Sequence, residues 1–109
     1  MRWLIALLAA LAWLFAGLNF AWSATTWSAK ASLATERGYH TATLLPSGQV
    51  MATGGSNNAS NLASVELYAP ATNTWSAAGA LVSARGSHTA TLLSSGQVLV
   101  SGGGSNGSV

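Results

Sequence analysis

The sequence contains no cysteine and no aspartate, and its only acidic residues are Glu36 and Glu66. The lack of cysteine excludes disulfides, thiolate metal sites and cysteine nucleophiles. Four Lys/Arg residues against two acids give a formal net charge of +2, which is too small a surplus to form a basic patch that neutralises phosphates. The composition therefore predicts no nucleic-acid partner.

The one long apolar run lies at the N-terminus. Met1 and Arg2 precede an apolar stretch over residues 3–18 that only Gly17 interrupts. A basic start, an apolar helical core and a small-x-small site are the layout of a secretory signal peptide. Ala21 and Ser23 supply the two small residues, so we predict a signal peptide over 1–23, cleaved after Ser23, and a secreted or periplasmic protein. An uncleaved membrane anchor is the alternative, because residues 3–22 provide the roughly 20 residues that span a bilayer.

From residue 24 onward the chain repeats itself with a period of 48 residues. Residues 26–61 align with 74–109 without a gap and share 21 identities in 36 positions. The matched features are Trp27 with Trp75, Arg37 with Arg85, His40 with His88, and the doublet Gly54-Gly55 with Gly102-Gly103. A period of about 40–50 residues is typical of solenoids and propellers.

The content of each repeat favours strands over helices. No segment after residue 24 places apolar residues at every third or fourth position over ten residues. Short segments rich in Thr, Val, Leu and Tyr lie between turn residues, and they predict strands near 39–45, 49–54, 63–69 and 74–78. Neither face of 40–45 is charged, which suits a sheet that is covered on both sides. The predicted fold is all-β, with four-stranded antiparallel blades of a β-propeller.

Several spaced residues of the repeat resemble a kelch repeat. They are Arg37 and His40, the doublet Gly54-Gly55, Tyr68 and Trp75. The amino-acid sequence of residues 40–50 is most similar to that of bacterial secreted kelch proteins and of the central propeller of galactose-oxidase-like proteins. The resemblance implies that the glycine doublet ends the second strand, the tyrosine lies on the third and the tryptophan on the fourth. It assigns repeat-structural roles to Trp27, Arg37, His40, Gly54, Gly55, Tyr68, Trp75, Arg85, His88, Gly102 and Gly103.

The repeat divides the chain after the signal peptide into three parts. We expect residues 24–36 to be the outer strand of a preceding blade, 37–84 to be a complete kelch repeat, and 85–109 to be a partial second repeat. A propeller has about four to eight blades, and each blade buries its faces only against its neighbours. We therefore expect this chain to be a truncated product or a fragment that needs further blades to complete the fold.

The candidate sites favour structure over chemistry. His40 and His88 occupy equivalent positions and could contribute to a shared metal site, but such a site needs three or four ligands, and acids are scarce. Arg37 and Arg85 recur in the repeat, so we expect them to pair with Glu66 or to donate to carbonyls. The sequence therefore predicts no catalytic, cofactor-binding or metal residue, and no enzyme activity.

The predicted function is that of an exported kelch-type propeller module with a binding or structural role. Its uncharged surface, rich in Ser, Thr and Asn, suits an unidentified protein or carbohydrate partner. The alternative is the N-terminal part of a longer secreted galactose-oxidase-like copper oxidase whose catalytic residues lie beyond residue 109. The resemblance implies a copper ion held by Tyr and His, with a Tyr cross-linked to Cys, and this chain has no cysteine for that cross-link. A non-functional remnant is the third hypothesis.

Overall fold

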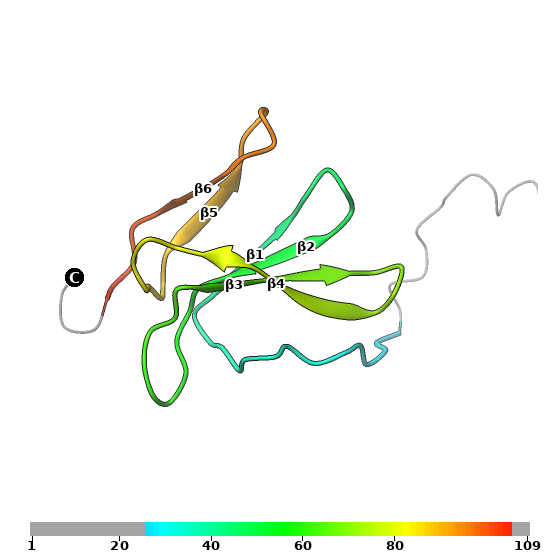
Figure 1. Ribbon diagram of the computed structural model, residues 1–109, viewed down its shortest axis with the longest axis horizontal. Coiled ribbons are helices and arrows are strands. Elements are labelled where there is room, and N and C mark those ends of the chain that lie inside the picture. The colour runs from blue at the N-terminus through cyan, green and yellow to red at the C-terminus, as the bar shows by residue number, and fades with distance from the viewer. Residues whose placement is uncertain (1–25, 106–109) are drawn as a thin grey trace, which may run out of the picture.

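The computed structural model describes residues 26–105, which form six strands (Figure 1). The strands are β1 (Thr41–Leu44), β2 (Val50–Thr53), β3 (Ser64–Ala69), β4 (Thr74–Ala80), β5 (Thr89–Leu92) and β6 (Val98–Ser101). Each of the first four lies within two residues of a predicted strand, so the all-β prediction is confirmed for this part of the chain. The predicted signal peptide over 1–23 lies outside the described residues.

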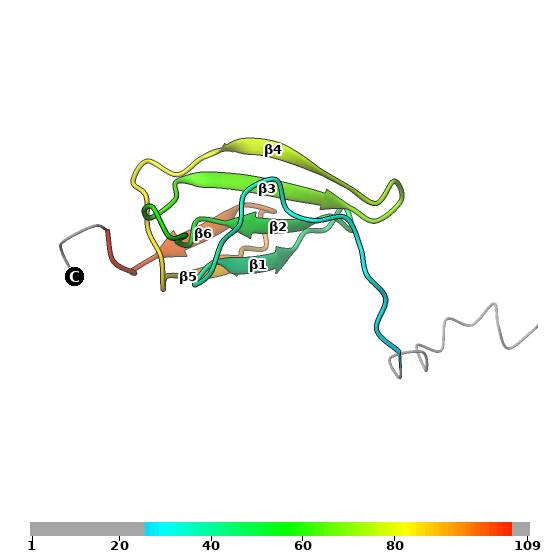
Figure 2. The same cartoon turned by 90° about the horizontal axis from the view of Figure 1, so that it is seen from below.

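Strands β1 to β4 form one antiparallel sheet in the order β1-β2-β3-β4 (Figure 2). The turn between β1 and β2 is tied by hydrogen bonds from Leu45 N to Gln49 O and from Gly48 N to Leu45 O, both 2.9 Å long. Gly48 has a φ of 86°, the left-handed conformation that glycine adopts most readily. The same turn recurs between β5 and β6, where Leu93 N donates to Gln97 O over 2.8 Å. These features are those expected of one four-stranded blade followed by the first hairpin of a second.

The hairpin β5–β6 packs on one face of the four-stranded sheet, and the segment before β1 runs along the other face (Figures 1 and 2). The sheet and the hairpin are closest where β1 meets β5. Three backbone hydrogen bonds join the two repeats next to this contact, from Gly55 N to Arg85 O (2.8 Å), from Ser87 N to Tyr39 O (2.9 Å) and from Arg85 N to Leu62 O (3.1 Å). Face-to-face contact of successive repeats is the arrangement that propeller blades require.

Residues 26–40 form no strand, and this differs from the expected outer strand at 24–36. A fourth strand of another blade needs a third strand beside it, and none of the described strands takes that place. The segment instead runs in extended form along the sheet, where Ala31 O accepts a 2.8 Å hydrogen bond from Nε1 of Trp75. Its assignment to a preceding blade remains a prediction.

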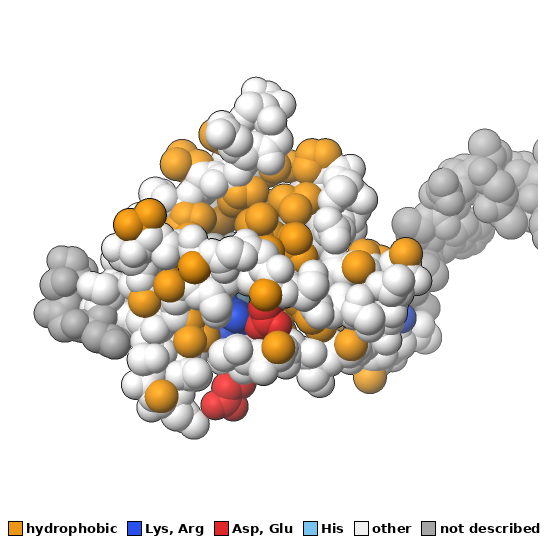
Figure 3. Space-filling view, in the orientation of Figure 1, with side chains coloured by type: hydrophobic (Ala, Val, Ile, Leu, Met, Phe, Trp, Pro, Cys, Tyr) orange, Lys and Arg blue, Asp and Glu red, His pale blue; other side chains and the backbone are white. Residues whose placement is uncertain are grey.

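The core of the described residues is small. Ala52 and Val65 are its buried hydrophobic side chains, and they share the interior with the polar residues Thr53, Glu66 and His88. Other hydrophobic side chains gather in the hollow between the hairpins β1–β2 and β5–β6, where Figure 3 shows them at the surface. Between residues 26 and 105, no helix has the length and hydropathy needed to span a bilayer.

Candidate functional site

A buried ion pair joins the start of the repeat to its third strand. Nη2 of Arg37 lies 2.7 Å from Oε2 of Glu66, and the side chains are 0% and 6% exposed. The guanidinium also donates from Nη1 to the carbonyls of Gly54 (2.7 Å) and Ser64 (3.0 Å), and from Nη2 to Oγ of Ser64 (3.0 Å). Arginine suits this position because its planar fork can hold several acceptors at once. The pairing of Arg37 with Glu66 agrees with the sequence prediction.

Glu66 also holds the segment before β1 against the sheet. Its Oε1 accepts a 2.7 Å hydrogen bond from Ala34 N, and its Oε2 accepts one of 3.3 Å from Thr35 N. Burial alone would raise the pKa of this carboxyl, but the hydrogen bonds from Ala34 and Arg37 outweigh burial and hold the pKa below its ordinary value. Glu66 is therefore an ionised structural acceptor whose bonds are already taken.

The two glycines of the doublet face different neighbours. A Cβ atom on Gly54 would lie 2.7 Å from the carbonyl oxygen of Arg85 and 3.0 Å from Cε1 of His88, both in the second repeat. A Cβ atom on Gly55 would instead collide with the carbonyl oxygen of Gly38 and with His40, both in its own repeat. The first glycine thus allows the next repeat to approach, while the second allows close contact with residues 38–40 of its own repeat.

The second doublet shows the same division of roles. A Cβ atom on Gly103 would collide with the carbonyl oxygen of Gly86 and with His88, as Gly55 does with the matching residues. Around Gly102, by contrast, no atom of the described residues lies within 4 Å of such a Cβ, apart from its two neighbours in the chain. Arg85 donates from Nη1 to the carbonyl of Gly102 over 2.8 Å, which repeats the bond between Arg37 and Gly54.

The two histidines occupy equivalent positions but different surroundings. His88 is buried, and its Nε2 lies 3.0 Å from Oγ1 of Thr41 on the preceding repeat. Burial, aided by the charge of Arg85, lowers the pKa of His88 below its ordinary value, so the ring is held neutral. His40 is exposed. No group of three or more metal-ligating side chains occurs among the described residues, so these histidines are not brought into a metal cluster there.

The aromatic pair of the repeat packs within the blade. Tyr68 on β3 and Trp75 on β4 are register partners, with ring centroids 5.2 Å apart and planes tilted by 46°. The hydroxyl of Tyr68 donates to Oδ1 of Asn73 (3.0 Å), and the same oxygen accepts a bond from Ala31 N (2.9 Å). The indole of Trp75 likewise bonds Ala31 O. Trp27, the counterpart of Trp75, is fully exposed.

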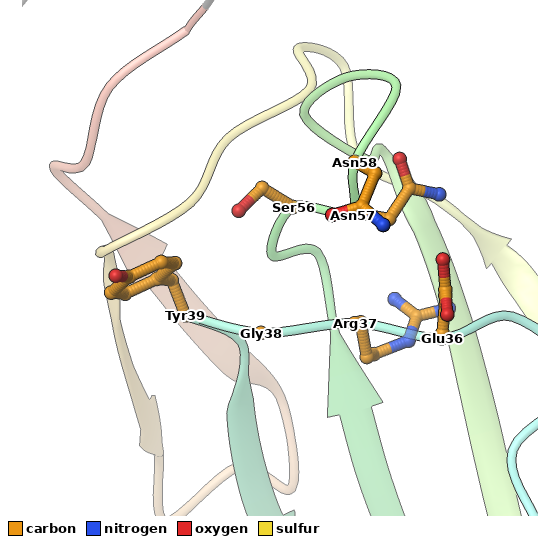
Figure 4. Close-up of a pocket in the computed structure, with 7 residues that line it drawn as sticks. All are labelled: Glu36, Arg37, Gly38, Tyr39, Ser56, Asn57 and Asn58. Carbon is orange, nitrogen blue, oxygen red and sulfur yellow. The ribbon is translucent and has the colours of Figure 1, made fainter.

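An open groove lies at one end of the blade, and the sequence analysis predicted no binding site there, although it assigned a structural role to Arg37, which is one of the lining residues. It has a volume of about 410 Å³, and its lining residues are Glu36, Arg37, Gly38, Tyr39, Ser56, Asn57 and Asn58 (Figure 4). The segments 36–39 and 56–58 are held together by reciprocal hydrogen bonds between Gly38 and Ser56, with N···O distances of 2.7 and 2.8 Å. A usable signal was present in the sequence, because several of these positions differ between the two copies of the repeat.

Comparison with protein families gives a match to the kelch motif over residues 37–81. This range contains β1 to β4, the ion pair and the first glycine doublet. A comparison with curated proteins gave no match. The motif and the antiparallel all-strand fold together fit a kelch repeat, which is one blade of a β-propeller.

Proposed function

We propose that this chain is an exported kelch-repeat propeller module that binds a partner and does not catalyse a reaction. The observation that carries the proposal is how the buried ionisable side chains are used. Arg37, Glu66 and His88 each bond groups of the protein itself, across the blade or between repeats. These contacts are structural, because they hold the segment before β1 against β3 and join one repeat to the next.

The open groove supports a binding role. It lies between loops at the end of the blade, and loops on a rigid scaffold commonly carry the binding function of a domain. The propeller fold itself hosts many unrelated functions, so the role is argued from these loops and not from the fold.

Export and binding are tested with the full chain. We expect bacterial expression with the N-terminal segment intact to yield a protein outside the cytoplasm whose mass corresponds to cleavage after Ser23. We expect the purified protein to bind members of an arrayed panel of saccharides and proteins. Retention in the cytoplasm, or failure to bind any arrayed compound, would contradict the proposal. Copper-dependent oxidation of primary alcohols by the chain would support the oxidase alternative instead.

A further inference from the structure

The groove beside Arg37 has a polar lining and one exposed aromatic ring. In Figure 4, Tyr39 lies at one end and Glu36 at the other, with the backbone of residues 37–38 between them and the loop 56–58 opposite. Tyr39 is 76% exposed to solvent. The lining therefore consists mainly of polar groups and one exposed ring, and not of hydrophobic core side chains.

Tyr39 occupies a backbone conformation that tyrosine does not favour. Its φ is 52°, in the left-handed region that costs a non-glycine residue about 1 kcal/mol or more. Its counterpart in the second repeat, Ser87, has a φ of 54°, so the repeat imposes this conformation on either residue. A bulky ring at such a position, exposed to solvent, contributes little burial to offset that cost. The fold alone does not explain why a tyrosine stands there.

The two copies of the repeat separate the structural residues of the groove from its variable ones. Arg37 and Gly38 have identical counterparts, and the structure uses both of them to build the blade. The variable positions are Glu36 against Ala84, Tyr39 against Ser87, Ser56 against Gly104, and Asn57 against Ser105. The second copy thus has the same bridge, between Gly86 and Gly104, but it lacks the carboxylate of Glu36, the ring of Tyr39 and the amide of Asn57, while Asn58 has an identical counterpart in Asn106. The carboxylate of Glu36, the ring of Tyr39 and the amide of Asn57 are therefore features that the repeat does not need.

We propose that this groove binds a neutral saccharide, a proposal that rests on the binding role argued above. The face of a sugar ring that carries C–H groups packs on the ring of Tyr39, whose π face is negative. Oδ1 of Asn57 accepts bonds from Ala59 N and Ser60 N, both 3.0 Å long, which leaves its Nδ2 to donate to a hydroxyl. The carboxylate of Glu36 accepts hydrogen bonds from hydroxyls, and the amide of Asn58 both donates and accepts.

The charges of the groove favour a neutral ligand over an anion. The guanidinium of Arg37 is fully buried and already bonds Glu66, Gly54 and Ser64. The remaining charge in the lining is the carboxylate of Glu36, which would repel a phosphate or a carboxylate. An exposed aromatic ring with a few polar groups around it is a common composition for a small-molecule site.

The test is saccharide binding by the full 109-residue chain and by variants that copy the second repeat. The probes are glucose, galactose, mannose, N-acetylglucosamine and their disaccharides, followed by saturation-transfer NMR and calorimetry, with glucuronate as the anionic control. Tyr39→Ser and Glu36→Ala introduce residues that the second repeat holds at the same positions, so both should fold, and far-UV circular dichroism checks this. Val82→Ser is the control, because it changes a fully exposed side chain that lies outside the groove.

We expect at least one neutral saccharide to bind with a dissociation constant of about 1 mM, as suits a ligand of that size. Tyr39→Ser should weaken binding roughly tenfold, Glu36→Ala should weaken it less, and Val82→Ser should leave it unchanged. Glucuronate should bind more weakly than the neutral sugar of the same shape.

Two results would overturn the inference while the binding role stands. One is saccharide binding that Tyr39→Ser and Glu36→Ala leave unchanged, which would place the site elsewhere. The other is an arrayed protein or peptide that depends on Tyr39 while every neutral saccharide fails to bind. If no ligand of any class binds the chain, both the inference and the proposed binding role fail.

Discussion

Substitution of Gly54 by alanine tests whether the first glycine of the doublet is needed for contact between repeats. The φ of Gly54 is 58°, and adopting this left-handed conformation costs an alanine about 1 kcal/mol. The added Cβ would also lie 2.7 Å from Arg85 O and 3.0 Å from Cε1 of His88. Because the nearer atom belongs to the backbone, the collision is relieved only if β5–β6 moves away from the blade.

Gly102→Ala is the matched control for this substitution. Gly102 is the equivalent residue of the second repeat, and its φ of 71° imposes a similar conformational cost of about 1 kcal/mol. Apart from the two adjacent residues, no atom between residues 26 and 105 lies within 4 Å of the Cβ that alanine would add there. The loss of unfolding free energy in Gly54→Ala should therefore exceed that in Gly102→Ala by the cost of the collision alone. Overpacking a well-packed contact costs about 1–3 kcal/mol.

The free energy of unfolding is measured by urea denaturation of the full chain, followed by tryptophan fluorescence. We expect Gly54→Ala to lower it by about 2–4 kcal/mol and Gly102→Ala to lower it by about 1 kcal/mol. Equal losses for the two variants would refute the reasoning, because the conformational cost would then account for the whole effect. A larger loss for Gly102→Ala would also refute it.

Three further predictions concern the buried polar contacts. Glu66→Gln should lower the free energy of unfolding by about 3 kcal/mol in urea denaturation, because it leaves a buried guanidinium without its counter-ion; an effect below about 1 kcal/mol would show that the ion pair is dispensable. The melting temperature should fall as the pH is lowered from 6.5, since the pKa of His88 is depressed in the folded state and the unfolded chain binds the proton more readily. The melting temperature should fall again below pH 4.5, because the pKa of Glu66 is also depressed in the folded state. A His88→Asn variant whose melting temperature still fell just below pH 6.5 would contradict the assignment of that decline to His88. Trp75→Phe should lower the free energy of unfolding by about 1 kcal/mol in the same denaturation assay, because the hydrogen bond to Ala31 O is lost. An unchanged urea midpoint would show that the segment before β1, which contains Ala31, does not stabilise the sheet.

Several parts of the structure were predictable because their signals are local. The turn at Leu45–Gln49 and the short strands on either side of it follow from residues adjacent in the chain. The repeat of 48 residues located the equivalent hairpin β5–β6. The partner of Arg37 was also within reach, because acids are so few that Glu66 was one of two candidates.

Other contacts depend on residues that are far apart in the sequence. The backbone N–H groups of Ala34 and Thr35 donate to Glu66, which is more than 30 residues away in the sequence, and no pattern in residues 26–36 indicates this. The groove was missed for a related reason, because Tyr39 and Asn57 are brought together only by the bridge between Gly38 and Ser56.

The sequence by itself determined the strands, the turns and the repeat, since each depends on the identity and spacing of nearby residues. Only the tertiary structure decided that Gly54 faces the next repeat while Gly55 faces its own, and that His88 is buried while His40 is exposed. Equivalent residues have identical local sequence preferences. Their surroundings differ because one repeat packs on the other, and that contact is a property of the folded chain.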